Sequence, residues 1–163
     1  MNTIALGWNR TLLELKQYAR EKESVFFSFL FPILMLVLFA TIFAGTIDGA
    51  GVNMSAAHWF LPGMISAGVL LTSFQTMAMS VAVERDDGTL KRLRSTPLPP
   101  VSFFLGKVGL VAITSIAQVA VLLAVARWAY DVPMPTGTRW LTFAWVFTLG
   151  VVAGVVLGLA YSS

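Results

Sequence analysis

Charged side chains gather in one stretch in the middle of the chain, residues 84–107, with the sequence ERDDGTLKRLRSTPLPPVSFFLGK. The stretch holds five of the eleven Lys and Arg residues and three of the eight Asp and Glu residues, and long apolar runs flank it on both sides. Cations, carboxylates and leucines in one short segment can recognise another protein through ion pairs and apolar contacts. The stretch predicts such a partner; a basic loop that only fixes orientation in a membrane is the alternative.

The rest of the chain has few residues suited to catalysis. It has no cysteine, and its only histidine, His58, lies beside Trp59. The long apolar runs carry no titratable residue near their middle, and no G-x-x-x-x-G-K-[ST] phosphate loop occurs. We therefore predict a non-enzyme with no catalytic residue and no metal site, in which energy for uphill transport comes from another subunit.

The charged stretch itself predicts a short helix. Asp87 can cap a helix that begins near residues 88–89, because its carboxylate accepts from unpaired backbone N–H groups. Leu90 and Leu93 fall on one face, one turn apart. Pro97 stops the helix by restricting the residue before it. The prediction is a short, rigid helix between two membrane spans.

The composition predicts that a membrane surrounds most of the chain. Apolar residues make up 57% and charged residues 12%, with a mean hydropathy of +0.80, whereas soluble domains have about 25% charged residues. A spanning helix needs about 20 mostly apolar residues. Four windows qualify and predict one all-α polytopic transmembrane domain over residues 1–163: residues 25–45, 59–83, 103–126 and 140–161.

Residues 3–20 predict an amphipathic helix that lies in the cytosolic headgroup layer, with Trp8 and Tyr18 as interfacial anchors. Its apolar residues recur at steps of three and four: Ile4, Trp8, Leu12, Leu15 and Ala19.

The distribution of Lys and Arg predicts the orientation. Four precede the first window, four lie between the second and third with Lys107 just beyond, and only Arg127 and Arg139 border the loop between the third and fourth. Since cationic loops stay in the cytosol, we expect a cytosolic N-terminus and a cytosolic segment at residues 84–102. The net charge of +3 then reflects orientation in the membrane, and no nucleic-acid partner is expected.

Polar and small residues inside the windows mark further candidate positions. Pro32 lacks an N–H, so a neighbour must satisfy the carbonyl that it leaves free. Polar residues in the second and third windows predict either internal packing or a translocation path: Ser73, Gln75, Thr76 and Gln118. A four-residue repeat of glycine in the last window predicts close helix packing: Gly150, Gly154 and Gly158.

Several short motifs at the end of the second window carry a family resemblance: Glu84–Arg85, Gly88–Thr89–Leu90, Arg92–Leu93, Thr96–Pro97 and Gly106–Lys107. With the amphipathic N-terminal helix, they make the chain resemble the permease of ABC-2 type transporters, a group that includes the daunorubicin-resistance permeases. The resemblance implies a coupling helix that sits in a groove of a separate ATPase subunit. The coupling residues it implies are Glu84, Arg85, Gly88, Thr89, Leu90, Arg92, Leu93, Thr96 and Pro97.

The resemblance also implies a partner set and a function. A second permease copy or paralogue would pair with this one in the cytoplasmic membrane, and the partner ATPase would bind ATP and Mg²⁺, since this chain holds no cofactor of its own. The expected activity is export of an amphipathic or apolar cargo such as a drug, polyketide, lipid or glycan. Such permeases have about six spans, so we expect a C-terminally truncated piece.

Two other functions stay open. A non-transporting membrane scaffold or assembly subunit would tolerate charge changes in the central segment and would show no ATPase-linked activity. A secondary transporter would need titratable groups inside further spans.

Overall fold

The computed structural model describes residues 3–43, 46–49, 52–86, 88 and 100–162, and it shows an all-α polytopic membrane protein with one small β-hairpin. The elements in chain order are α1 (Thr3–Arg20), α2 (Lys22–Ile42), β1 (Thr46–Gly49), β2 (Val52–Ser55), α3 (Ala56–Asp86), α5 (Pro100–Tyr130) and α6 (Arg139–Ser162). The predicted coupling helix falls mostly on residues outside this described set.

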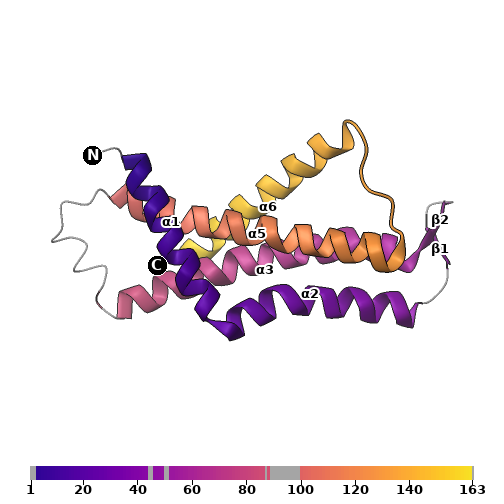
Figure 1. The fold of residues 1–163 in the computed structure, drawn as a ribbon, viewed down its shortest axis with the longest axis horizontal. Helices are drawn as coiled ribbons and strands as arrows, with labels where there is room; N and C mark the ends of the chain where they lie inside the picture. Colours follow the sequence, from indigo (N-terminus) through magenta and orange to yellow (C-terminus); the bar gives the residue numbers. More distant parts are fainter. Residues whose placement is uncertain (1–2, 44–45, 50–51, 87, 89–99, 163) are drawn as a thin grey trace.

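Four helices, α2, α3, α5 and α6, are long and apolar enough to cross a membrane, which confirms the predicted fold class. Each contains most or all of one predicted window, and α3 and α5 extend past their windows at both ends. β1 and β2 pair as an antiparallel hairpin between α2 and α3, at one end of the molecule. The hairpin lies at the opposite end from the two chain termini (Figure 1).

Local chemistry explains three of the helix ends. Pro100 is the first residue of α5, a position where a missing N–H costs nothing. Gly88 has a φ of 70° and donates its N–H to the Arg85 carbonyl, so this glycine closes the end of α3. α5 ends in the same way at Asp131, with a φ of 49°, while the N–H of Val132 reaches the carbonyl of Ala126.

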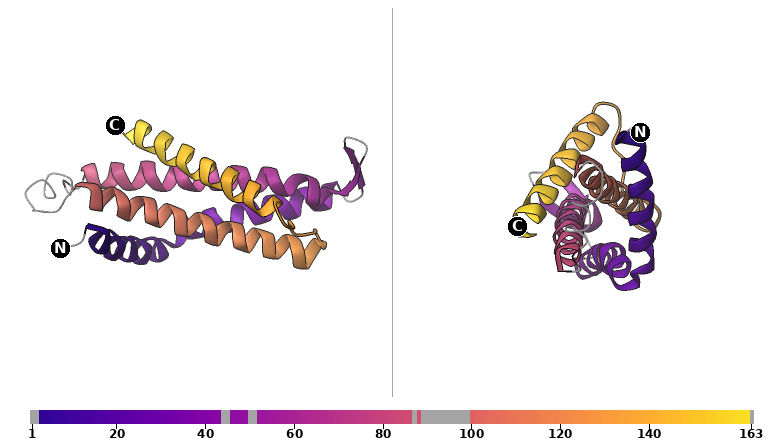
Figure 2. Two further views of the ribbon diagram at one scale, coloured as in Figure 1. Left: turned by 90° about the horizontal axis from the view of Figure 1, so that it is seen from above. Right: turned by 90° about the vertical axis from the view of Figure 1, so that its left-hand side faces the viewer.

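The core of the bundle centres on α3, which packs against α2, α5 and α6. Side chains from three helices are fully buried there, among them Leu36, Met77 and Val111. α1 packs instead on the flank of α5, opposite α6 (Figure 2). Many apolar side chains outside this core are exposed, as expected of a surface that meets lipid.

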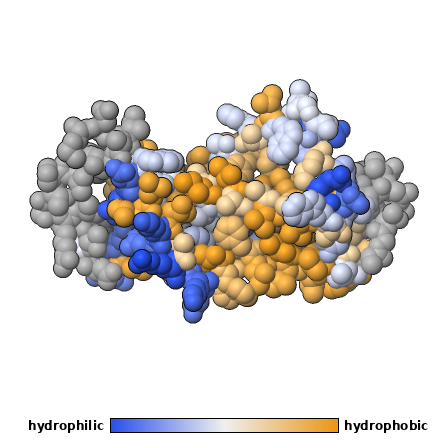
Figure 3. Space-filling model, in the orientation of Figure 1, coloured by the Kyte–Doolittle hydropathy of each residue, from blue (hydrophilic) through white to orange (hydrophobic). Residues whose placement is uncertain are grey.

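The surface shows where that lipid belt lies. Apolar residues cover the middle of the molecule (Figure 3). Hydrophilic residues gather around α1, at the end of the molecule where α3 has its C-terminal end. The C-terminal end of α3 and the start of α5 therefore meet α1 at one pole of the bundle.

Candidate functional site

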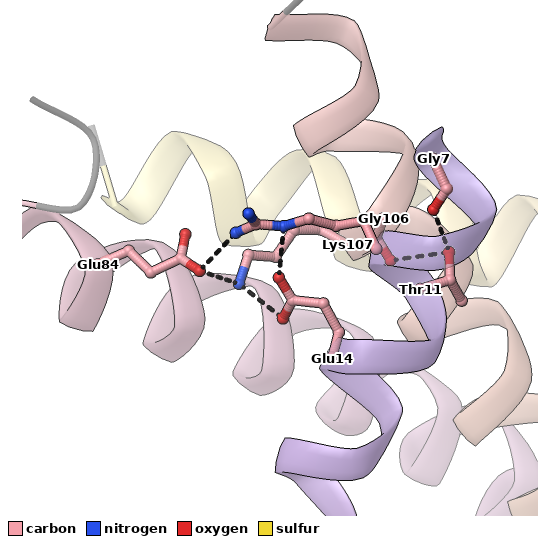
Figure 4. A network of polar contacts seen from close by, with 7 residues as sticks. Gly7, Thr11, Glu14, Glu84, Gly106 and Lys107 are labelled. Atoms are coloured by element: carbon pink, nitrogen blue, oxygen red, sulfur yellow. Dashed lines mark hydrogen bonds and ion pairs between the residues drawn. The ribbon is translucent and has the colours of Figure 1, made fainter. Parts of the chain in front are cut away.

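Four charged side chains from three helices meet where α1 crosses α5, and we refer to Arg10, Glu14, Glu84 and Lys107 as the charged cluster. The Lys107 ammonium lies 2.9 Å from Glu14 Oε2 and 3.0 Å from Glu84 Oε1. The Arg10 guanidinium lies 3.4 Å from Glu14 Oε1 and 3.3 Å from Glu84 Oε1. Two cations and two carboxylates thus form a neutral network that joins α1, α3 and α5 (Figure 4).

The network is enclosed by protein. The Lys107 side chain is 2% exposed, that of Glu14 6% and that of Glu84 16%. Both cations also lie over the ring of Phe103, the guanidinium of Arg10 at 5.1 Å and the ammonium of Lys107 at 5.5 Å from its centroid. Removing one partner of a buried ion pair costs about 3–5 kcal/mol because the other charge stays buried and unpaired. The cluster therefore resists being pulled apart.

Glycines bring α1 close enough to form the cluster. A Cβ on Gly106 would clash with the side chain of Arg10, and one on Gly109 would clash with the side chain of Thr11. The Thr11 hydroxyl, buried in this contact, donates to the Gly7 carbonyl at 3.1 Å and lies 3.4 Å from the Gly106 carbonyl. The Gly106–Lys107 pair thus combines a close helix crossing with the buried cation.

A groove of about 910 Å³ opens beside the cluster, between α1, α2, α3 and α5. All four cluster residues line it, and its remaining wall mixes polar groups such as Ser24 and Gln75 with apolar ones such as Val83 and Leu110. Tyr18 also borders it, and burial raises the pKa of the Tyr18 phenol above its usual range. The groove can accept a molecule with both polar and apolar parts.

The predicted ATPase-coupling residues divide into two groups. Glu84 and Arg85 lie on the last turns of α3, and Gly88 closes that helix. Glu84 points into the charged cluster, whereas Arg85 donates to the Ser162 carbonyl at 3.3 Å and so connects α3 to the end of α6. The others lie outside the described residues: Thr89, Leu90, Arg92, Leu93, Thr96 and Pro97.

The four predicted path residues do not lie together. Gln75 is exposed, and with Thr76 it lines the groove. Ser73 is fully buried, with its hydroxyl 3.4 Å from that of Ser115 on α5. Gln118 is 2% exposed, and its amide donates to the Ser28 carbonyl on α2 at 2.7 Å.

The predicted glycine ridge lies against α3. A Cβ on Gly154 would come within 2.5 Å of the Ser73 Cβ, and one on Gly158 within 2.8 Å of the Phe74 carbonyl oxygen. Gly150 has more room, with Val69 at 3.8 Å. The partner helix, which the sequence did not identify, is therefore α3.

The sequence analysis missed the charged cluster. It counted Arg10 toward orientation, used Lys107 for orientation and for the family resemblance, and gave Glu14 no role. One signal was present, because Lys107 lies inside an apolar window and a cation there needs a carboxylate partner. Within the described parts of the chain, no group of three His, Asp or Glu side chains is arranged to hold a metal ion.

Comparison with known proteins finds two curated relatives that match part of the chain. The chain is 34% identical over 76 residues to the probable multidrug ABC transporter permease YbhR of Escherichia coli (strain K12) and to the protein of the same name from Escherichia coli O157:H7. Each alignment covers 46% of this chain and 21% of the relative's length. No solved structure matches the chain significantly.

The family comparison covers far more of the chain. The family model described as ABC-2 type transporter matches residues 8–163, which include the charged cluster and all four candidate spans. With nearly the whole sequence matched and the predicted polytopic fold present, this chain belongs to the ABC-2 type transporter membrane family.

Proposed function

We propose that this chain is the membrane permease subunit of an ATP-driven exporter, powered by a separate ATPase subunit in the cytosol. Membership of the ABC-2 family supports a permease, and the name of the Escherichia coli relatives supports the broad class of transport. ATP and Mg²⁺ would bind the ATPase subunit. A second permease copy or paralogue would complete the membrane unit.

The proposed orientation puts the N-terminus and the α3–α5 connection in the cytosol. The Lys and Arg residues before α2 and between α3 and α5 outnumber those at the other end. α1 and the facing ends of α3 and α5 form one pole of the bundle, so Arg10, Arg85 and Lys107 on these helices share one side of the membrane in this proposal. That side is where a cytosolic ATPase would bind.

The observation that carries the proposal is the ion pair that joins α3 to α5 on either side of their connection. Glu84 precedes the connection and Lys107 follows it, and their charged groups lie 3.0 Å apart. Two long helices joined at their base can convert a push on the connection into tilting of both spans. A flexible loop that only fixes orientation in the membrane would not need a buried ion pair between the helices that it joins.

The groove is the candidate entrance for cargo. Gln75 and Thr76 supply uncharged hydrogen-bonding groups, and Met79, Val83 and Leu110 supply apolar surface. An amphipathic or apolar cargo such as a drug, polyketide or lipid suits this mixture. Ser73 and Gln118 act in helix packing in this proposal, because both are buried between helices.

The test changes the two leucines of the predicted coupling helix. The protein is expressed from its native reading frame together with its ATPase subunit, and Leu90→Asp/Leu93→Asp is compared with Leu90→Ile/Leu93→Ile. The Asp variant is expected to lose ATPase copurification and vesicle transport, because two charges would enter an apolar contact. The Ile variant keeps both.

Full copurification and transport in the Asp variant would contradict the coupling role. Absence of any ATPase-linked transport in the unchanged protein would favour a scaffold function instead.

A further inference from the structure

We infer that the charged cluster is a mechanical link through which displacement of the α3–α5 connection moves α1 and reshapes the groove. This inference rests on the proposed function. It assigns Arg10, Glu14 and Lys107 as positioning residues, which act on cargo through the placement of a helix.

The charged cluster joins α1 to both ends of the α3–α5 connection. Glu84 on α3 and Lys107 on α5 lie on either side of the connection, and both contact α1, through Arg10 at 3.3 Å and Glu14 at 2.9 Å. α1 is therefore bonded to both ends of the segment that would meet the ATPase. Few contacts hold it elsewhere, since it packs mainly on α5 and only slightly on α2.

The ion pairs of the cluster resist separation when one of its helices is displaced. Lys107 is 2% exposed, so separating it from its carboxylates would leave a cation buried in a low-dielectric environment. Motion of the three helices as a unit preserves every ion pair. The glycine contacts at Gly106 and Gly109 add close backbone packing, which transmits movement of α5 directly to α1.

The cluster and α1 both form parts of the groove wall. Arg10, Glu14, Glu84 and Lys107 form part of the groove wall, and the C-terminal half of α1 forms another part through Gln17, Tyr18 and other residues. α2 follows α1 after a single residue, Glu21. A displacement of α1 by about 1–2 Å, the scale of helix shifts in switching proteins, therefore changes the width of the groove.

The experiment cuts α1 out of the network without touching the base of the connection. Arg10→Gln/Glu14→Gln removes one cation and one carboxylate, so the cluster stays neutral and the pair between Lys107 and Glu84 remains. The matched control is Arg127→Gln/Asp131→Asn, which removes an exposed pair of the same i,i+4 spacing. Both variants are prepared in the native reading frame with the ATPase subunit in lipid vesicles.

Two readouts separate a mechanical role from a structural one. The first is the ratio of cargo transported to ATP hydrolysed. The second is the distance between spin labels on Asn9→Cys and Trp128→Cys, both exposed positions, with and without trapped nucleotide. The printed chain has no cysteine of its own, which keeps labelling within it specific.

In the unchanged protein and the control, nucleotide is expected to shift the Asn9–Trp128 distance. In Arg10→Gln/Glu14→Gln, hydrolysis continues, the shift disappears and transport per ATP falls by roughly 5- to 150-fold, the usual range of coupling between sites. Should the double variant not fold, Glu14→Gln alone removes the ion pair between α1 and Lys107 but leaves the contact of Arg10 with Glu84, so it is expected to reduce the distance shift without abolishing it.

A variant that keeps both the distance shift and the transport ratio overturns the inference alone. An unchanged protein without nucleotide-dependent distances and without ATPase-linked transport contradicts the proposed function, and the inference with it.

Discussion

At the scale of single residues, Gln118 shows how a polar group in a membrane span can serve the backbone. Pro32 has no N–H, so the carbonyl four residues before it, that of Ser28, loses its helical donor. The Gln118 amide donates to that carbonyl at 2.7 Å, from a helix 90 residues away in the chain. The sequence predicted that a neighbour would satisfy this carbonyl, and it offered Gln118 for internal packing or for a translocation path without connecting it to Pro32.

This geometry predicts the outcome of a double-mutant cycle. Gln118→Leu is expected to lower the free energy of unfolding by about 1–3 kcal/mol, because the Ser28 carbonyl would be left without a donor. Pro32→Ala in the same protein restores an N–H, so the double variant recovers most of the loss. Thermal unfolding in detergent measures both changes.

The exposed Gln75 supplies the control for that cycle. Gln75→Leu is expected to leave stability unchanged within about 0.5 kcal/mol and to alter transport, because Gln75 lines the groove. Equal destabilisation by Gln118→Leu with and without Pro32→Ala would contradict the assigned hydrogen bond.

At the scale of elements, α1 has two different faces. Among residues 7–20, four are buried and pack toward α5 and the groove: Gly7, Thr11, Glu14 and Tyr18. Of the apolar stripe expected from the sequence, Trp8 is 59% exposed and Leu12 44%. Trp8 and Leu12 are therefore free to meet lipid, as an interfacial helix requires, whereas the buried face of α1 makes the protein contact. Tyr18, predicted as a membrane anchor beside Trp8, is 8% exposed.

The contact between α6 and α3 gives a prediction at the same scale. Gly154→Ala is expected to destabilise the protein by about 1–3 kcal/mol, because its Cβ would come within 2.5 Å of the Ser73 Cβ in a tightly packed interface. Gly150→Ala should be neutral or stabilising by up to about 1 kcal/mol, since it meets only Val69 at 3.8 Å and gains helix propensity. Midpoints of thermal unfolding in detergent compare the two. Equal midpoints would show that α6 does not approach α3 along this ridge.

At the scale of the whole molecule, the two ends of the bundle differ. The charged cluster, both termini and the base of the α3–α5 connection occupy one pole, and the β-hairpin occupies the other (Figure 1). An apolar belt separates the two (Figure 3). Because the two ends differ, an experiment can determine which end faces the cytosol.

Cysteine labelling tests that orientation. Gln17→Cys on α1 and Thr138→Cys before α6 are both exposed. In inverted membrane vesicles a membrane-impermeant maleimide is expected to label Gln17→Cys and to spare Thr138→Cys, because the Lys and Arg bias predicts that α1 lies on the cytosolic side. Right-side-out vesicles should give the reverse pattern, and labelling of both residues from one side would contradict the proposed topology.

The amino-acid sequence by itself determined the number of spans, the amphipathic helix before them and the family. Each of these follows from runs of neighbouring residues: about 20 apolar residues define a span, and the motif from Glu84 to Lys107 is nearly contiguous. These features need no knowledge of which helix packs on which.

Only the tertiary structure decided how the polar residues are used. Lys107 meets Glu14 across 93 positions and Gln118 meets Ser28 across 90. Several helix arrangements would satisfy the same hydrophobic pattern, and each would bring different side chains together. One particular packing of the helices produces the charged cluster, the hydrogen bond to the Ser28 carbonyl and the contact of the glycine ridge with α3. The reason is that a buried charge or carbonyl is stabilised only by the group that lies beside it in space.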